Sequence, residues 1–151
     1  MTLGAGVEKL PFFVYGTLRT GEDNWERFLK NRTEQEIPAV LPGHKMFVDV
    51  FPFVTDAGEG SQVTGNLVYP RPELYEAVTR DLDGLEEYDP ATDTGWYMRV
   101  IREAVYKDSA GHTQRVRVWV YHGGPDIIND LDEKNLELSG DWLTHLSREL
   151  G

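Results

Sequence analysis

The sequence predicts an α+β fold, and three observations support this prediction. Some segments alternate apolar and polar residues as strands do, whereas others carry apolar residues at the three- and four-residue spacing of helices. The segments follow one another as strand, helix, several strands, helix, hairpin and helix, without the strict alternation of a doubly wound sheet. No internal repeat or long linker interrupts this order, so residues 11–151 are predicted to form a single domain.

Composition excludes several classes of function. The chain has 151 residues with 26 acidic and 15 basic side chains, a net charge of −11, which argues against binding to nucleic acid or to an anionic membrane surface. Cysteine is absent, which excludes disulfides, thiol nucleophiles and cysteine-based zinc sites. No apolar run approaches the roughly 18 residues of a membrane span, and no signal peptide is recognisable. A cytoplasmic protein is therefore expected.

The N-terminal part of the chain is expected to contain a leader, a strand and a helix. Residues 1–10 include glycines and are predicted to be a flexible leader. The apolar run 11–15 predicts a buried strand that ends at Gly16, where the backbone is free to bend. Residues 22–30 carry aromatic and apolar residues at helical spacing, so a short helix is predicted there.

The middle of the chain predicts strands followed by a long helix. Residues 37–54 are rich in Val, Phe and Pro and predict strands broken at Pro42-Gly43 and at Phe51-Pro52. Residues 62–69 predict another strand. The most regular helix is expected over residues 72–88, because it opens on a proline followed by a glutamate and shows a clear apolar stripe.

The last third predicts a hairpin and a closing helix. Residues 97–106 and 114–122 alternate, and the segment between them contains a glycine suited to a turn. Residues 89–96 are expected to be a loop over a pocket, with Trp96 as a wall, or a plain connection. Residues 140–150 place apolar side chains four apart and predict a short final helix.

The bend after the first strand is the first candidate site. Once the strand ends at Tyr15, the N–H groups of Gly16, Thr17 and Leu18 leave the sheet ladder and are free to hold an anionic or polarised oxygen. The same pattern is also typical of an ordinary sheet edge. The bend alone therefore leaves the two interpretations open.

Several motifs in order resemble the γ-glutamylcyclotransferase-like (AIG2-like) family. The resemblance covers about residues 11–146 and begins with a Tyr-Gly-Ser-Leu signature in which this chain has Thr for Ser. The motifs are Tyr15-Gly16-Thr17-Leu18-Arg19, Leu82-Asp83-Gly84-Leu85-Glu86, Tyr97-Met98-Arg99, Val118-Trp119-Val120-Tyr121 and Ser139-Gly140-Asp141-Trp142. The resemblance implies a small, mixed, partly closed β-barrel flanked by helices, with a pocket at one mouth.

The resemblance also implies that Glu86 is the catalytic carboxylate, and helical periodicity gives an independent test. At about 100° per residue, Glu86 lies roughly 70° from the centre of the apolar stripe, whereas Glu87 lies roughly 170° away and faces water. A position at the border of the stripe is both protected and reachable. The alternative is that the two glutamates are a solvated surface pair. Asp81 lies on the opposite border and is the second choice, although its position favours a cap or a salt bridge.

The reaction that the resemblance implies is the cyclisation of a γ-glutamyl amine or amide to 5-oxoproline with release of the amine. Glu86 would act as base and then acid, with a pKa raised by partial burial. No metal or organic cofactor is expected, and His44, His112, His122 and His145 lack the spacing of a zinc-binding helix. The alternatives are a non-catalytic module that binds a small molecule in the same pocket, and an interaction protein. The sequence leaves the substrate and the oligomeric state open.

Supporting roles follow from the same resemblance and keep their alternatives. Tyr15 and Tyr121 would line the substrate pocket or be buried strand aromatics, and Arg19 would pair with a substrate carboxylate or be exposed. Arg99 is expected to form a structural ion pair with an acid of the helix. Asp141 is expected to cap the last helix, with the neighbouring tryptophan in the core.

Overall fold

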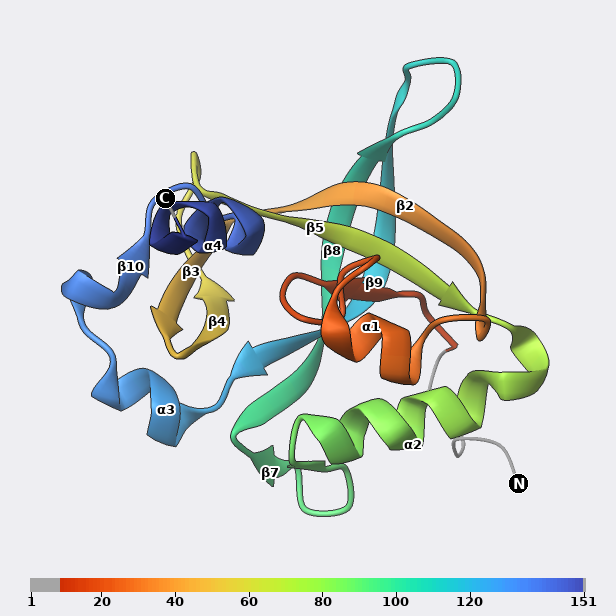
Figure 1. The fold of residues 1–151 in the computed structure, drawn as a ribbon, viewed down its shortest axis with the longest axis horizontal. Coiled ribbons are helices and arrows are strands. Elements are labelled where there is room, and N and C mark those ends of the chain that lie inside the picture. Colours follow the sequence, from red (N-terminus) through yellow and green to blue (C-terminus); the bar gives the residue numbers. More distant parts are fainter. Residues whose placement is uncertain (1–8, 151) are drawn as a thin grey trace.

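Five strands close into a barrel in the order β1-β5-β2-β8-β9 in the computed structural model, which describes residues 9–150 (Figure 1). Two of its strand pairings are short: β1 pairs with β9 in parallel at Phe12 and Trp119, and β2 pairs with β8 at Val40 and Val105. The α+β class and the barrel are thus confirmed. The barrel strands are β1 (Phe12–Val14), β2 (Thr33–Pro42), β5 (Gln62–Pro70), β8 (Tyr97–Lys107) and β9 (Thr113–Gly123).

A smaller sheet of order β10-β3-β4 lies beside the barrel. It comprises β3 (His44–Asp49), β4 (Phe51–Asp56) and β10 (Leu136–Glu137). The expected break at Pro42-Gly43 is confirmed, since Gly43 turns with a φ of 68°. The second break lies at Val50, with a φ of 65°, and not at Phe51-Pro52. Pro52 is tolerated inside β4 because β4 is an edge strand of its sheet. One side of an edge strand makes no hydrogen bonds within the sheet, so the N–H that proline lacks is not required on that side.

The predicted helices are present with shorter ends, and further elements appear. Residues 89–96 contribute to a two-stranded pairing instead of a plain loop, and two short helices after β9 were not predicted. Helix α2 ends at Leu85, three residues before the predicted end, because Glu87 adopts a left-handed φ of 54°. The elements are α1 (Asp23–Phe28), η1 (Pro72–Leu74), α2 (Tyr75–Leu85), β6 (Tyr88–Asp89), β7 (Thr94–Gly95), α3 (Pro125–Asp130), η2 (Glu133–Asn135) and α4 (Trp142–Leu150).

Strand β1 lies between two apolar layers and sends alternate side chains to each. Phe13, with Tyr15 just beyond the strand, packs into the cluster that fills the barrel and includes Trp142, as expected for a core tryptophan. Phe12 and Val14 pack into a second cluster together with Val78 and Leu82 of α2. This alternation fixes α2 against β1, and therefore places the end of α2 near the bend that follows β1.

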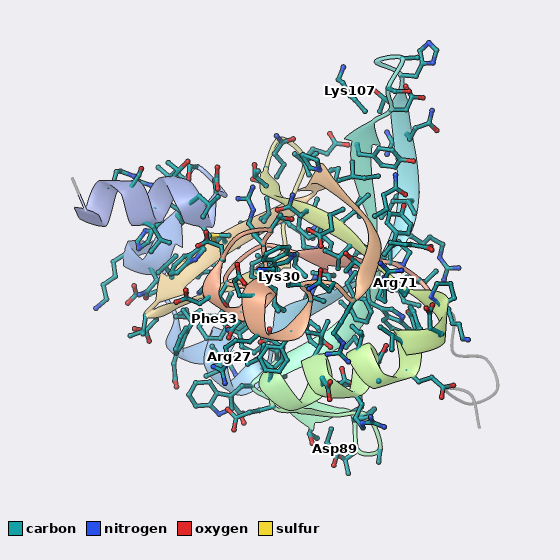
Figure 2. The ribbon with its side chains drawn as sticks, turned by 45° about the vertical axis from the view of Figure 1, so that its right-hand side comes forward. Arg27, Lys30, Phe53, Arg71, Asp89 and Lys107 are labelled. Carbon is teal, nitrogen blue, oxygen red and sulfur yellow. The ribbon has the colours of Figure 1, made fainter. Side chains whose placement is uncertain are left out.

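The ends of the chain and the β8–β9 hairpin complete the description. Residues 1–8 of the predicted leader lie outside the described residues, whereas the Leu10 carbonyl accepts a hydrogen bond of 2.6 Å from the Tyr75 hydroxyl. The hairpin projects from the barrel, and Figure 2 shows Lys107 near its tip. Within residues 9–150, no helix combines the length and the apolar character needed to cross a membrane.

Candidate functional site

A cavity of about 380 Å³ lies where the end of α2 meets the bend after β1. Segments far apart in the sequence form its wall: the bend, helix α1, the start of β4, the end of α2, the start of β8 and the end of β9. Its volume is within the range of small-molecule sites. The lining residues are Phe13, Val14, Tyr15, Gly16, Thr17, Leu18, Asn24, Arg27, Phe51, Pro52, Leu85, Glu86, Glu87, Trp96, Tyr97 and Tyr121.

Glu86 lies at the wall of this cavity as the C-terminal cap of α2. Its N–H donates to the Leu82 carbonyl at 2.9 Å, so the backbone still follows the helix at this residue. Burial raises the pKa of the Glu86 carboxyl from 4.5 to about 7. Among the residues that the structure describes, no cation or hydrogen-bond donor to this carboxyl offsets the effect. The carboxyl is therefore poised to exchange protons near neutral pH.

The neighbouring Glu87 is exposed, as the helical periodicity predicts. The reason differs from the expected one, because the helix does not continue to residue 88. The backbone turns into the left-handed region at Glu87 and leaves α2. The angular argument therefore applies to Glu86, which retains near-helical backbone angles, while Glu87 reaches the surface through the turn.

The bend after β1 contributes three consecutive residues to the cavity wall. Gly16, Thr17 and Leu18 all line it, and within residues 9–150 the structure gives no hydrogen-bond acceptor for their N–H groups. The Thr17 carbonyl accepts from the N–H groups of Asn24 and Trp25 at 3.1 Å each, which fixes the start of α1 against the bend. Consecutive amides without an internal acceptor are groups that can hold a negatively charged or polarised oxygen.

Gly16 is required by close packing across the cavity wall. A Cβ atom at this position would lie 2.9 Å from Cγ of Pro52. Such a contact is shorter than van der Waals packing allows, so a side chain at residue 16 would push the bend away from β4. The sequence predicted a bend at Gly16, and the structure adds the close approach of a proline ring.

The two tyrosines predicted for the pocket line it with their hydroxyl groups already engaged. The Tyr15 hydroxyl donates to the Tyr121 carbonyl at 2.6 Å, and the Tyr121 hydroxyl donates to Oδ1 of Asp83 at 2.6 Å. Burial raises the pKa of both tyrosines well above the ordinary value. Both residues therefore hold the shape of the cavity wall as neutral phenols.

The structure does not bring Arg19 to the cavity. Its guanidinium donates to Oδ1 of Asn66 at 3.0 Å and pairs with Asp141 at 2.8 Å. Asp141 also accepts from the N–H of Leu143 at 3.0 Å, as expected of a cap of α4. Arg19 therefore connects the bend to the last helix. Its side chain is held by acceptors that lie far from it in the sequence, which the sequence alone could not show.

Arg99 forms the predicted ion pair with an acid of α2. Its Nε atom lies 2.9 Å from Oδ1 of Asp83, and both side chains are 8% exposed. The guanidinium also lies over the Trp119 ring, 4.4 Å from its centroid. Asp83 is one turn before Glu86, so this pairing holds the end of α2 against the barrel. Asp81 is in contact with Arg32 at 3.0 Å and does not line the cavity.

Sequence reasoning missed several residues of the wall. Asn24 and Arg27 reach it from α1, and Arg27 supplies a cation among the lining residues (Figure 2). Phe51 of β4 was also missed, whereas Trp96 lines the cavity, in agreement with the first of the two interpretations of residues 89–96. The two side chains are 54% and 53% exposed and form the rim.

Away from the cavity, the structure brings together three possible metal ligands. His44, Asp56 and His122 each offer a ligand atom, and these atoms lie within 4.8 Å of one another. The spacing of these residues along the chain gives no indication of this group, because it is not the spacing of ligands on one helix. These residues come from three different strands.

Comparison with known proteins agrees with this architecture. The sequence profile of the family described as "Gamma-glutamyl cyclotransferase, AIG2-like" matches residues 12–144. The chain belongs to this family. Among curated proteins no significant match was found. The resemblance stated from the sequence motifs is thereby confirmed, and the family supports a general assignment to γ-glutamylcyclotransferase-like proteins.

Solved structures share the fold of the AIG2-like family at low sequence identity. The uncharacterized protein PH0828 from Pyrococcus horikoshii superposes with a TM-score of 0.57 and 17% identity, covering 93% of this chain and 97% of the other. The protein At5g39720.1 from Arabidopsis thaliana gives 0.56 and 22%, with coverage of 93% and 81%. An AIG2-like protein from Mus musculus gives 0.51 and 21%, with coverage of 87% and 86%. These likenesses establish the fold.

Proposed function

We propose that this protein is a γ-glutamylcyclotransferase-like enzyme that converts a γ-glutamyl amine or amide to 5-oxoproline and releases the amine. The observation that carries the proposal is that Glu86, whose pKa burial raises to about 7, lines the same cavity as the bend after β1, whose amides have no acceptor among residues 9–150. A proton carrier and an oxyanion site side by side are what an intramolecular acyl transfer needs.

The reaction begins with the Glu86 carboxylate taking a proton from the α-ammonium of the glutamyl unit. The resulting amine attacks the γ-carbonyl carbon of the same unit, and a new C–N bond closes the five-membered ring. As the bond from this carbon to the leaving nitrogen breaks, Glu86 returns a proton to that nitrogen. Glu86, ionised again, takes the second proton from the ring nitrogen as the lactam forms and passes it to the released amine. Near neutral pH, two protons thus leave the attacking nitrogen and two arrive at the departing amine, which becomes an ammonium ion. Proximity is already supplied by the substrate chain.

The bend supports the developing negative charge. The N–H groups of Gly16, Thr17 and Leu18 line the cavity without described acceptors, so they are available to the γ-carbonyl oxygen or to the substrate carboxylate. Arg27 is available at the same wall for the remaining carboxylate. The exposed aromatic rim of Phe51 and Trp96 is placed to contact the leaving amine.

The proposal is tested by offering the purified protein a panel of γ-glutamyl amino acids and amines while 5-oxoproline is measured. Glu86→Gln should reduce turnover by about 100-fold or more, which is the usual contribution of a general base. The matched control is Glu73→Gln, which changes an exposed glutamate at the start of the same helical segment and outside the cavity wall. Because the base must be ionised, kcat/KM should fall as pH decreases below about 7.

Two results would contradict the proposal. Full turnover by Glu86→Gln would remove the assigned proton carrier. Absence of turnover on the whole panel, together with thermal stabilisation by γ-glutamyl compounds, would favour a binding module that uses the same cavity.

A further inference from the structure

Three metal-ligating side chains converge where the smaller sheet meets the barrel. His44 opens β3 and Asp56 closes β4, and the two residues face each other in the register of the antiparallel pair. His122 comes from β9 of the barrel. The Nε2 atoms of the two histidines lie 2.8 Å apart, and Nε2 of His44 lies 3.3 Å from Oδ1 of Asp56. All three groups therefore point at one region.

The hydrogen bonds of His44 leave a lone pair directed at this region. Its Nδ1 atom is 3.0 Å from the Pro42 carbonyl oxygen, which only accepts, so Nδ1 carries the proton and donates it. In the neutral imidazole, Nε2 is then an acceptor. It faces a carboxylate oxygen that is also an acceptor, and a second imidazole nitrogen that can supply at most one proton. Three atoms of the types that ligate metals thus converge on one point, where a metal ion could accept a lone pair from each.

We propose that His44, Asp56 and His122 form a binding site for a divalent transition metal of the zinc type. Two imidazoles and one carboxylate, with water in the fourth position, is a donor set that zinc accepts. The Pro42 carbonyl that orients His44 is the outer contact that metal-bound histidines usually have. Both histidine side chains are buried, whereas the Asp56 side chain is 59% exposed and leaves a path for the ion.

The distances are close to those of a bound ion. Ligand atoms about 2.1 Å from a tetrahedral zinc lie about 3.4 Å from one another. The distance of 3.3 Å from His44 to Asp56 already meets this requirement. The two histidine nitrogens, at 2.8 Å, would need to separate by about 0.6 Å. A small rotation of one imidazole ring provides such a change.

Arg102 influences the site through Asp56. Its guanidinium donates to both oxygens of Asp56, at 2.8 Å and 2.7 Å. Each carboxylate oxygen keeps a second lone pair, so these bonds orient Asp56 without using all its acceptor capacity. The positive charge of Arg102 weakens the attraction for a metal. We therefore expect weaker affinity than at sites whose carboxylate has no cationic partner.

A metal here would connect the two sheets of the fold. His44 and Asp56 belong to the smaller sheet and His122 to the barrel, so the ion would link β3 and β4 to β9. Strand β4 also supplies Phe51 and Pro52 to the cavity wall. The inference does not depend on the proposed enzymatic function, because its readout is binding and stability.

The experiment is a titration of the chelator-treated full chain with Zn²⁺, measured by calorimetry, together with thermal unfolding in the presence and absence of Zn²⁺. One ion should bind per chain, and Tm should rise by about 5–10 °C at a 100-fold excess over Kd. His44→Ala and His122→Ala should each weaken binding at least about 10-fold, the lower bound for perturbing a metal site. His112→Ala is the matched control, because that imidazole is 76% exposed on the β8–β9 hairpin.

A measurement on the unmutated protein covers the case in which a variant fails to fold. Imidazole ¹⁵N resonances should shift on addition of Zn²⁺ at Nε2 of His44 and of His122, and not at His112 or His145. The proposal is overturned if the unmutated protein binds no Zn²⁺ at saturable stoichiometry. It is equally overturned if His44→Ala binds as well as the unmutated chain, or if the shifts occur only at the other two histidines.

Discussion

Ionisation of Glu86 is expected to destabilise the folded protein, and Glu86→Gln should remove this cost. Burial raises the pKa of Glu86 from 4.5 to about 7, and one pKa unit corresponds to about 1.4 kcal/mol. Ionising this half-buried carboxyl therefore costs up to about 3 kcal/mol of folding free energy. For an unfolding free energy of about 5–15 kcal/mol, this is a substantial fraction.

The direction in which stability changes with pH follows from the number of protons that the folded and unfolded states bind. Between pH 4.5 and about 7 the folded protein keeps the Glu86 proton while the unfolded chain has lost it, so stability decreases as pH rises through this window. Below the window both states are protonated and no cost is present. Above it the full cost applies. The glutamine variant, which cannot ionise, should therefore gain stability relative to the unmutated protein as pH increases.

The assay is urea unfolding of both proteins at about pH 4.5 and about pH 8.5, with Glu87→Gln as the control. Other titrating groups cancel in the difference between variants, because they are common to all three proteins. We expect Glu86→Gln to be up to about 3 kcal/mol more stable than the unmutated chain at the higher pH, and close to it at the lower pH. The reasoning is refuted if the difference is the same at both pH values, or if Glu87→Gln behaves like Glu86→Gln.

Two further predictions concern packing. Asp83→Asn leaves the guanidinium of Arg99 buried without a counter-charge and should lower the free energy of unfolding, measured in urea, by about 3–5 kcal/mol. Asp81→Asn breaks a more exposed pair on the same helix and should lower it by about 1 kcal/mol or less. Equal losses for the two variants would contradict the assigned burial. Gly65→Ala would place a Cβ atom 2.3 Å from a backbone oxygen of β1 and should lower Tm by roughly 4–12 °C. Gly84→Ala, in open space on α2, should leave Tm unchanged or raise it. A Gly65→Ala protein as stable as the unmutated chain would contradict the packing described for Gly65.

Much of the candidate site was predictable because its parts are local. The apolar run ending at Gly16 predicted the bend, and helical periodicity separated Glu86 from Glu87. The remaining wall was not predictable, because Arg27 and Phe51 reach the cavity only through the packing of α1 and β4. Arg19 failed to reach the cavity for the same reason, since its partners are remote in sequence.

The sequence by itself determined most strands, the main helices and the bend, because these depend on backbone preference and on periodicity within one element. Only the tertiary structure decided which of these elements share a wall. The closure of the barrel brings the end of α2 to the bend after β1, and the sheet register brings His44 and Asp56 to His122. Contacts of this kind depend on three-dimensional packing between segments far apart in the chain, for which a single sequence carries no local signal.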